Sequence, residues 1–377
     1  MKILVILTYY YPHWTGLTAY ARRLAEGLAR RRHQVTVLTS QYWHTLPREE
    51  VHNGVRIVRL KRLLRLSRGV VMPSFPFAAN RLIREHDVVQ VHVPILEAPL
   101  VTALASRWGK RVVITHHGDL VMPGGPFDQL VESSVTWLMK RALRSAARVT
   151  IHTQDYARNS PFLSQFQEKL VQIPPPVEIP LPVPEQVAAW RRELGLDGFK
   201  LVGFAGRFVE EKGFDFLLKS IPYILEHMPD ARLVYAGEVN VVYESFFEQW
   251  RHLVERWKDH IVMLGLLNDP QQVANFYAMC DVLALPSRTD CFPMVQVEAM
   301  LCGTPTVVTD IPGLRVPVQL TGMGRLVRPQ DERALAEGLL EVLQDRQHYI
   351  RSRDDIAALF DLERTIDTYE ELFQSLA

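Results

Sequence analysis

The stretch that decides the fold is "DVLALPSRTDCFPMVQVEAMLCGTPTVVTD", residues 281–310. Two short runs rich in β-branched and apolar residues, 281–286 and 304–310, flank a longer apolar segment, which predicts strand, helix, strand. Pro293 suits the first position of that helix, where its missing N–H costs nothing, and Gly303 suits its end. A strand, a helix and a second strand in this order form one unit of a parallel sheet.

The same alternation repeats through the whole chain, which predicts an α/β protein. A chain of 377 residues exceeds the usual size of a single core, so we expect two domains. The proline-rich segment "PPPVEIPLPVP" continues neither helix nor strand, and we interpret it as the linker. We therefore expect two doubly wound domains, residues 1–178 and 179–360, with a cleft between them, and ligands at the carboxyl ends of the strands. The other predicted strands are 2–7, 34–39, 55–60, 87–92, 111–115, 148–152, 200–206, 231–237, 260–265 and 324–329.

Composition excludes several classes of protein. The chain is 47% hydrophobic and 23% charged, as in ordinary soluble globular proteins, and it has no apolar run long enough to span a membrane. The opening "MKILVILT" is interpreted as a buried strand rather than a signal peptide. The three cysteines (Cys280, Cys291 and Cys302) match neither a disulfide framework nor a zinc site, and they indicate the cytoplasm.

Charge is distributed unevenly. Residues 1–178 hold 24 Lys and Arg against 12 Asp and Glu, a net charge of +12, whereas the remaining residues hold 19 against 30, a net charge of −11. Such asymmetry indicates nucleic acid, an anionic membrane surface or an anionic substrate, and the sequence contains no nucleic-acid motif. The basic segments 59–77 and 139–148 fit either a bilayer surface or a solvated helix face, and the charge asymmetry favours the membrane.

The loop "GFAGRFVEEKGFD", residues 203–215, follows a predicted strand and precedes a helix. Glycine lets a backbone approach a ligand closely, and the cations Arg207 and Lys212 can close on an anion such as a diphosphate. An ordinary solvated loop with two surface cations is the alternative. The corresponding loop after the first strand, "TYYYPHWTGLTAY", has Gly16 as its pivot, and this glycine by itself is a weaker signal.

Two carboxylates, Asp290 and Glu298, flank the start of the helix in 281–310. The helix N-terminus offers backbone donors to an anion, and a carboxylate can accept both hydroxyls of a ribose. The alternative is that Asp290 complements the helix dipole and Glu298 pairs with a lysine. The combination with the loop of Arg207 and Lys212 favours ligand binding.

The order of these motifs resembles the family 4 retaining glycosyltransferases of the GT-B fold, the glycosyl transferase group 1, over nearly the whole chain. The family's hallmark of two glutamates separated by seven residues reads Asp290 and Glu298 here. The resemblance implies two Rossmann-like domains, the first binding the acceptor and the second the nucleotide-sugar donor. It also implies that the amphipathic segment at about 361–377 packs back on the first domain. The motifs that carry it are "PHWTG", "ITHHGD", "IPPPVE", "GRFVEEKG", residues 281–310 and "GRLVRPQDERALAEGL".

The resemblance also assigns residues to roles. Arg207 and Lys212 would grip the diphosphate, Glu298 the ribose and Asp290 the transferred sugar. His117 would contact that sugar from the first domain, with its neighbour His116 pointing into the sheet. The remaining donor-binding positions would be Gly16, Gly206 and Gly237, and the amides around Phe292, Met294 and Val295.

The implied reaction is transfer of a sugar, from a UDP- or GDP-sugar for example, to a glycan or lipid-linked acceptor. Retention of configuration at the anomeric carbon would follow if the acceptor attacks on the same face of the sugar from which the diphosphate leaves. No Asp-x-Asp motif is present, so we expect no metal and no other cofactor. Departures from the family pattern are Asp290 for glutamate, Thr15 for a glycine and Val316 for a frequent glutamate. A sugar-nucleotide epimerase and a non-catalytic sugar-nucleotide-binding protein are the alternatives.

Overall fold

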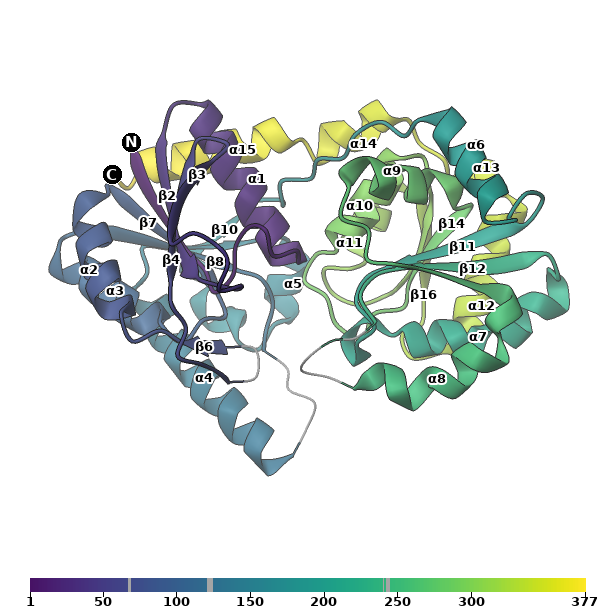
Figure 1. The fold of residues 1–377 in the computed structure, drawn as a ribbon, viewed down its shortest axis with the longest axis horizontal. Coiled ribbons are helices and arrows are strands. Elements are labelled where there is room, and N and C mark those ends of the chain that lie inside the picture. The colour runs from purple at the N-terminus through teal and green to yellow at the C-terminus, as the bar shows by residue number, and fades with distance from the viewer. Residues whose placement is uncertain (67–68, 121–124, 240, 242–244) are drawn as a thin grey trace. The chain divides into compact units, whose positions relative to one another are not determined.

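The computed structural model describes residues 1–66, 69–120, 125–239, 241 and 245–377. Its internal contacts divide the chain into two compact units: unit 1 comprises residues 1–176 and 362–377, and unit 2 comprises residues 177–361. The boundary predicted from the sequence lies after residue 178, and the returning helix was predicted at about 361–377. Each unit has helices on both faces of its main sheet (Figure 1).

The main sheet of unit 1 has eight strands in the described residues, in the order β10-β9-β8-β7-β1-β2-β4-β3. Neighbouring strands are parallel except for β3 and β4, which form an antiparallel hairpin at one edge. A separate two-stranded sheet joins β5 and β6. The strands are β1 (Lys2–Ile6), β2 (Gln34–Ser40), β3 (Glu49–His52), β4 (Val55–Leu60), β5 (Leu64–Leu66), β6 (Gly69–Val71), β7 (Val88–Val93), β8 (Arg111–His116), β9 (Arg148–Ile151) and β10 (Leu170–Gln172).

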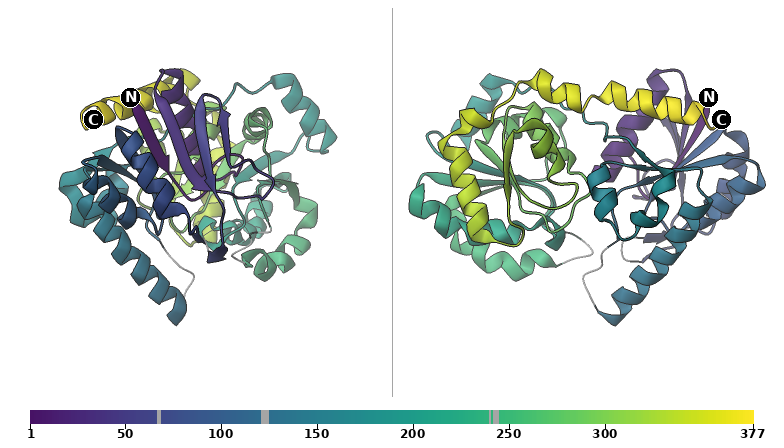
Figure 2. Two further views of the ribbon diagram at one scale, coloured as in Figure 1. Left: turned by 60° about the vertical axis from the view of Figure 1, so that its left-hand side comes forward. Right: turned by 180° about the vertical axis from the view of Figure 1, so that it is seen from behind.

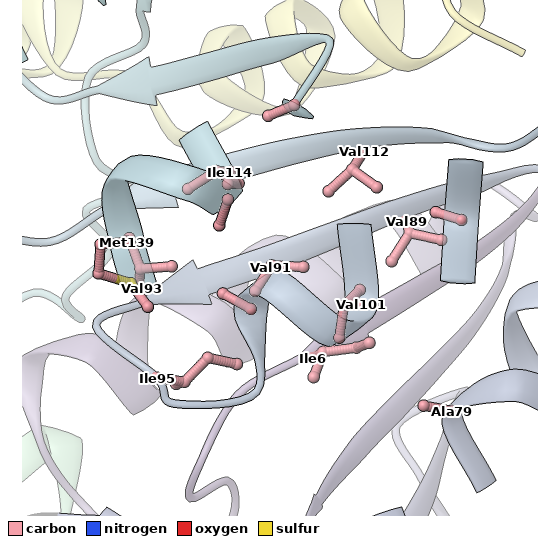
Figure 3. Close-up of a cluster of buried hydrophobic side chains, with 14 of the residues drawn as sticks. Ile6, Ala79, Val89, Val91, Val93, Ile95, Val101, Val112, Ile114 and Met139 are labelled. Atoms are coloured by element: carbon pink, nitrogen blue, oxygen red, sulfur yellow. The ribbon is translucent and has the colours of Figure 1, made fainter. Parts of the chain in front are cut away.

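One face of this sheet carries an apolar core. Val89, Val91 and Val93 alternate along β7 and point toward the helices, where they meet Val101 of α3 and Met139 of α4 (Figure 3). Alternation with a period of two places every second residue of a strand on this face. The helices of unit 1 are α1 (Gly16–Arg30), α2 (Phe75–Glu85), α3 (Ala98–Arg107), α4 (Pro126–Ser145), α5 (Gln154–Asn159), η1 (Leu163–Lys169) and α15 (Leu362–Gln374).

The opposite face of the unit 1 sheet is covered by α1 and α15, which lie side by side (Figure 2). A Cβ on Gly27 of α1 would lie 2.2 Å from Ile366 Cδ1 of α15, so the two helices pack without room for a side chain there. Ile366, Tyr369 and Phe373 are buried and Leu372 is partly buried, in agreement with the predicted apolar side of this helix. The C-terminal helix is therefore part of unit 1.

The sheet of unit 2 has six parallel strands in the described residues, in the order β13-β12-β11-β14-β15-β16. Along the chain, β11 comes first, β12 and β13 are added on one side of it, and β14, β15 and β16 are then added on its other side. The point of reversal therefore lies between β11 and β14. The strands are β11 (Lys200–Ala205), β12 (Ala231–Ala236), β13 (Ile261–Gly265), β14 (Val282–Leu285), β15 (Thr306–Thr309) and β16 (Gly324–Val327).

Helix α10 begins one residue later than predicted. Pro293 is its N-cap, with an extended ψ of 103°, and Met294 is the first helical residue. The helices of unit 2 are α6 (Pro184–Glu193), η2 (Glu210–Lys212), α7 (Phe214–His227), α8 (Phe246–Arg256), η3 (Lys258–His260), α9 (Pro270–Met279), α10 (Met294–Leu301), α11 (Val316–Thr321), α12 (Glu332–Gln344), α13 (Arg346–Tyr349) and α14 (Arg353–Leu359).

The two basic segments are not single helices. Segment 59–77 runs from the end of β4 through β5 and β6 into α2, and its residues 67 and 68 lie outside the described residues. Segment 139–148 forms the last turns of α4 and the start of β9, with Arg141 and Arg144 exposed and Met139 buried. Within the described residues, no helix combines the length and apolarity needed to cross a bilayer.

Candidate active site

The order reversal in unit 2 brings together the loops that follow β11 and β14. In sheets of this kind, ligands bind outside the carboxyl ends of the strands at that point. Gly213, which ends the first loop, has a φ of 69°, and a Cβ there would lie 1.9 Å from the carbonyl oxygen of Pro286. Only glycine fits this conformation and this contact, so the residue lets the two loops approach.

The predicted diphosphate cations lie at this edge of the sheet. Lys212 Nζ donates to Asp290 Oδ2 at 2.6 Å, which joins the two loops across 78 positions of sequence. Burial opposes the charge of Lys212, but the carboxylates of Asp290 and Glu211 outweigh that effect and hold its pKa above the ordinary value. Arg207 Nη2 lies 3.2 Å from Glu211 Oε1. Both cations therefore face carboxylates of the protein itself.

A second ion pair braces the same loops. The two guanidinium nitrogens of Arg288 donate to the two carboxylate oxygens of Asp215 at 2.8 Å each, and the Asp215 side chain is fully buried. The backbone N–H of Arg288 also donates to the carbonyl of Glu211 at 2.8 Å. Bidentate pairs of this kind fix geometry strongly. Both residues lie in stretches that the sequence singled out, 281–310 and 203–215, but neither was assigned a role, because the pair forms only when the two loops meet.

The N-terminus of α10 completes this edge. Phe292, Met294 and Val295 form the turn that starts the helix, as predicted, and Gln296 N donates to the carbonyl of Pro293 at 3.0 Å. The helix dipole makes such a terminus favourable to anions. Glu298, one turn further along, is 8% exposed and accepts a hydrogen bond of 3.2 Å from the hydroxyl of Tyr277.

The two predicted glycines of this edge are neighbours. A Cβ on Gly237 would lie 1.8 Å from the carbonyl oxygen of Gly206, so β12 ends against the loop after β11. The hydroxyl of Tyr235 donates to the same oxygen at 2.8 Å. Gly206, Arg207, Lys212, Gly237 and Asp290 are thus brought together within unit 2.

Gly16 lies in unit 1 as the first residue of α1. The residue before it, Thr15, caps the helix: its Oγ1 accepts from Thr18 N at 3.2 Å, and Thr18 Oγ1 accepts from Thr15 N at 2.7 Å. This reciprocal arrangement satisfies two backbone donors at the helix start. Threonine at a position where the family often has glycine therefore has a structural role here.

His117 lies in a cluster of three imidazoles at the carboxyl ends of β7, β8 and β9. Its Nε2 is 2.7 Å from His92 Nδ1, and its Nδ1 is 3.3 Å from His152 Nε2. The ring of Tyr20 from α1 meets His117 edge-on, with 4.9 Å between centroids. Both ring nitrogens of His117 therefore face neighbouring histidines.

Burial keeps this cluster neutral. It lowers the pKa of His92 and of His152 to about 3, each helped by a neighbouring imidazole, and it lowers that of His117 well below its ordinary value. His116, predicted to point into the sheet, is 4% exposed and pairs with Asp119 at 3.3 Å. His92 and His152 went unnoticed in the sequence, although each stands at the end of a predicted strand.

The cysteines and the clusters of acidic side chains and histidines give no sign of a disulfide or a metal site in the described residues. All three cysteines are free thiols. Among the residues that the structure describes, no group of three or more His, Cys, Asp and Glu is arranged to hold a metal ion. The described edge of unit 2 thus combines two cations paired with carboxylates, a helix N-terminus and the buried carboxylate of Glu298.

Comparison with known proteins identifies the family. The model described as "Glycosyl transferases group 1" matches residues 199–345, and the one described as "Glycosyl transferase 4-like domain" matches residues 15–176. The chain belongs to the group 1 glycosyltransferases. This confirms the family resemblance and the prediction that the protein is a glycosyltransferase enzyme. The alternative hypotheses, a sugar-nucleotide epimerase and a non-catalytic binding protein, are therefore not pursued.

Relatives of this glycosyltransferase span nearly its whole length. An uncharacterized glycosyltransferase of Methanocaldococcus jannaschii is 27% identical over 92% of this chain and 90% of its own. The O-antigen chain mannosyltransferase C of Escherichia coli is 26% identical over 100% of this chain and 99% of its own. Among solved structures, the Anabaena protein HepE in complex with UDP and glucose has a TM-score of 0.79 at 20% identity, covering 100% of both chains. The predicted GT-B fold is therefore confirmed.

Proposed function

We propose that this glycosyltransferase moves a sugar from a nucleotide-sugar donor to a glycan or lipid-linked acceptor, with retention of configuration and without a metal ion. The observation that carries the proposal is the pair of Lys212 and Asp290, 2.6 Å apart at the order reversal of the unit 2 sheet. The HepE structure with UDP and glucose and the E. coli relative, by its name a mannosyltransferase, support a nucleotide-sugar donor.

Each residue of the donor site has a proposed role. Arg207 and Lys212 exchange their carboxylate partners for the diphosphate, since a diphosphate carries more negative charge and more acceptor oxygens than a single carboxylate. The amides at the start of α10 bind the phosphates at the positive end of the helix dipole. Glu298 accepts the ribose hydroxyls. Asp290, released from Lys212, contacts the transferred sugar, and His117 contacts it from unit 1.

The reaction breaks the bond between the anomeric carbon and the diphosphate oxygen and forms one to the acceptor oxygen on the same face. The acceptor hydroxyl gives its proton to the departing phosphate, so no protein base is required. Negative charge grows on the diphosphate in the transition state, and the fixed cations Arg207 and Lys212 stabilise it. Those cations also perform the task that a divalent metal performs elsewhere. Full activity in excess chelator is expected, and loss of activity there would refute metal independence.

The location of the acceptor is proposed from the distribution of charged residues. Unit 1 contains most of the +12 half of the sequence, and α4 exposes Arg141 and Arg144 on its outer surface. A polybasic surface adds attraction to anionic lipids, so we propose peripheral contact with an anionic membrane that carries the acceptor. Sedimentation with anionic vesicles at low salt tests this, and a protein that stays in the supernatant would favour a soluble acceptor.

Thermal-shift measurements with UDP, GDP and their sugars test the donor site, because a ligand that binds only the folded state raises the melting temperature. We expect one nucleotide class to raise it and the Lys212→Ala variant to lose that response. Lys258→Ala, which removes an exposed lysine of η3, is the matched control and should respond like the wild type. No response of the wild type to any nucleotide would contradict the proposal.

A further inference from the structure

Aromatic rings gather at the carboxyl edge of the unit 1 sheet, in the loops after β1 and β2. We call Tyr9, His13, Tyr42 and Trp43 the aromatic platform. His13 lies between the two tyrosines, 4.9 Å from Tyr9 and 4.3 Å from Tyr42 between ring centroids, and Tyr42 is 5.0 Å from Trp43. The four rings therefore form one continuous cluster.

The platform is exposed at one end and anchored at the other. Trp43 is 48% exposed, whereas Tyr9 is partly buried and packs against the apolar core of unit 1. Gln41 holds the loop in shape, since its Nε2 donates to the carbonyl of Leu46 at 2.7 Å and its backbone N–H to that of Leu60 at 2.8 Å. Trp43 therefore presents an exposed aromatic ring at the end of a continuous ring cluster, on a loop that hydrogen bonds hold in place, which suits contact with a ligand.

Cations lie over these rings and their neighbour. The guanidinium of Arg62 is 5.9 Å from the ring centre of Tyr42. Trp14, next to His13 in sequence, is 37% exposed, and the guanidinium of Arg22 is 4.4 Å from its ring. The surface therefore combines aromatic rings with guanidinium N–H donors, which lie over two of the rings.

This combination matches a sugar ring. A pyranose has a face of C–H groups, which are apolar and weakly positive and so fit the electron-rich face of an aromatic ring. Its rim of hydroxyls needs hydrogen-bond donors and acceptors, which the nearby arginines and the platform's polar ring atoms supply. A lipid chain would need an apolar surface without such donors.

We infer that Trp43 and the platform behind it form an acceptor subsite that binds a saccharide ring by stacking, with Trp14 as a second contact. The inference rests on the proposed function, because a sugar-transferring enzyme needs a hydroxyl-bearing acceptor and unit 1 is the half assigned to it. It goes further in naming the recognised part of the acceptor as a saccharide rather than a lipid chain. Ligand-binding loops of such sheets lie at this carboxyl edge.

Binding of the full chain to an array of immobilised oligosaccharides of glucose, galactose, mannose and N-acetylhexosamines tests the inference. The wild type should bind at least one of them. Trp43→Ala should weaken that binding roughly tenfold, the size of one lost aromatic contact, and Trp43→Phe should stay close to the wild type. Trp108→Ala is the matched control, because Trp108 is another exposed tryptophan, at 37% against 48% for Trp43, but it follows α3, on the loop that leads into the amino end of β8.

The outcomes separate this inference from the proposed function. Nucleotide binding, measured by thermal shift on the same samples, should be equal in the wild type and in Trp43→Ala. The inference is overturned if no saccharide binds the wild type, if Trp43→Ala binds like Trp108→Ala, or if Trp43 is needed only for binding to phosphatidylcholine vesicles. Absence of nucleotide binding in the wild type would instead remove the proposed function.

Discussion

Each unit has a mainly parallel sheet whose strand order reverses, between β1 and β7 in unit 1 and between β11 and β14 in unit 2, but the residues at the carboxyl edges of the two sheets differ. In unit 2 the edge consists of charges in pairs, Lys212 with Asp290 and Arg288 with Asp215. In unit 1 the corresponding edge contains the neutral imidazoles of His92, His117 and His152, whose pKa values burial lowers. Topology thus decides where a ligand site lies, and the residues at the strand ends decide its chemistry.

This difference carries a functional lesson. In the proposed function, the cations of the charged edge exchange their carboxylate partners for the oxygens of an anion. A neutral edge of rings offers hydrogen bonds and aromatic faces, which suit an uncharged polar molecule. The division matches the transferase proposal, in which one half binds a diphosphate and the other a hydroxyl-bearing acceptor.

The first test breaks the charged edge through its backbone. Gly213→Ala would place a Cβ 1.9 Å from the Pro286 carbonyl at a φ of 69°, so the two loops must separate. We expect a loss of about 3 kcal/mol in the free energy of unfolding, from overpacking and the left-handed conformation together, measured by urea denaturation.

Gly195→Ala is the control for that loss, because Gly195 has a φ of 66° with no heavy atom within 4 Å of the added Cβ. Gly195→Ala should lower the free energy of unfolding by only about 1 kcal/mol, which is the cost of placing alanine in the left-handed conformation. Equal losses in the two variants would mean that the close approach of the loops is unimportant.

The second test uses acid to break the neutral edge. His92 and His152 have a folded pKa of about 3 against an ordinary value of 6.5, so the unfolded chain binds protons that the folded chain refuses. Their stabilisation is full above about pH 6.5 and is lost as the pH falls toward 3. From pH 7 to 5 the free energy of unfolding should drop by about 2 kcal/mol per histidine.

His92→Asn keeps a nitrogen near the position of Nδ1 and removes the titration. Its free energy of unfolding should fall less between pH 7 and 5 than that of the wild type, by about 2 kcal/mol. His348→Asn changes an exposed histidine and should leave the slope as it was. An unchanged slope in His92→Asn would contradict this account, because it would show that His92 binds protons equally in the folded and the unfolded chain.

The smallest expected effect comes from the surface that attaches α15 to unit 1. Arg31 faces Glu363 at 2.8 Å and Glu370 at 3.0 Å, and Asp367 also accepts from it. Because the acidic partners are partly exposed, Arg31→Gln should lower the free energy of unfolding by about 1 kcal/mol or less at low salt, and by still less at about 1 M salt. Thermal denaturation at the two salt concentrations measures the difference. A loss that does not change with salt would point to packing of the arginine stem instead.

Much of the fold was predictable because it depends on periodicity. The apolar runs, the proline linker and the amphipathic helix with Ile366, Tyr369 and Phe373 each encode their structure locally. The hairpin of β3 and β4 was missed although Asn53 and Gly54 form its turn, with φ values of 47° and 80°, a sequence pair typical of tight hairpins. The exposed pattern of β3 hid the strand from a search based on apolar runs.

The candidate site was predictable where its residues are close in sequence to a glycine or a helix start, as Arg207, Lys212 and Asp290 are. The ion pair of Arg288 and Asp215 joins residues 73 positions apart and forms only when two loops meet, so no local sequence pattern predicts it. The histidine cluster combines three strands in the same way. Contacts of this kind depend on strand order, which periodicity leaves open.

The central claim is that Lys212 binds the donor diphosphate at the order reversal of unit 2. Calorimetric titration of the wild type and of Lys212→Ala with the nucleoside diphosphate that raises the melting temperature tests it most directly, with Lys258→Ala as the control. The account predicts a dissociation constant at least tenfold weaker in Lys212→Ala, the loss of one charge-assisted contact to phosphate, and an unchanged one in the control. Equal affinity in all three proteins would contradict it.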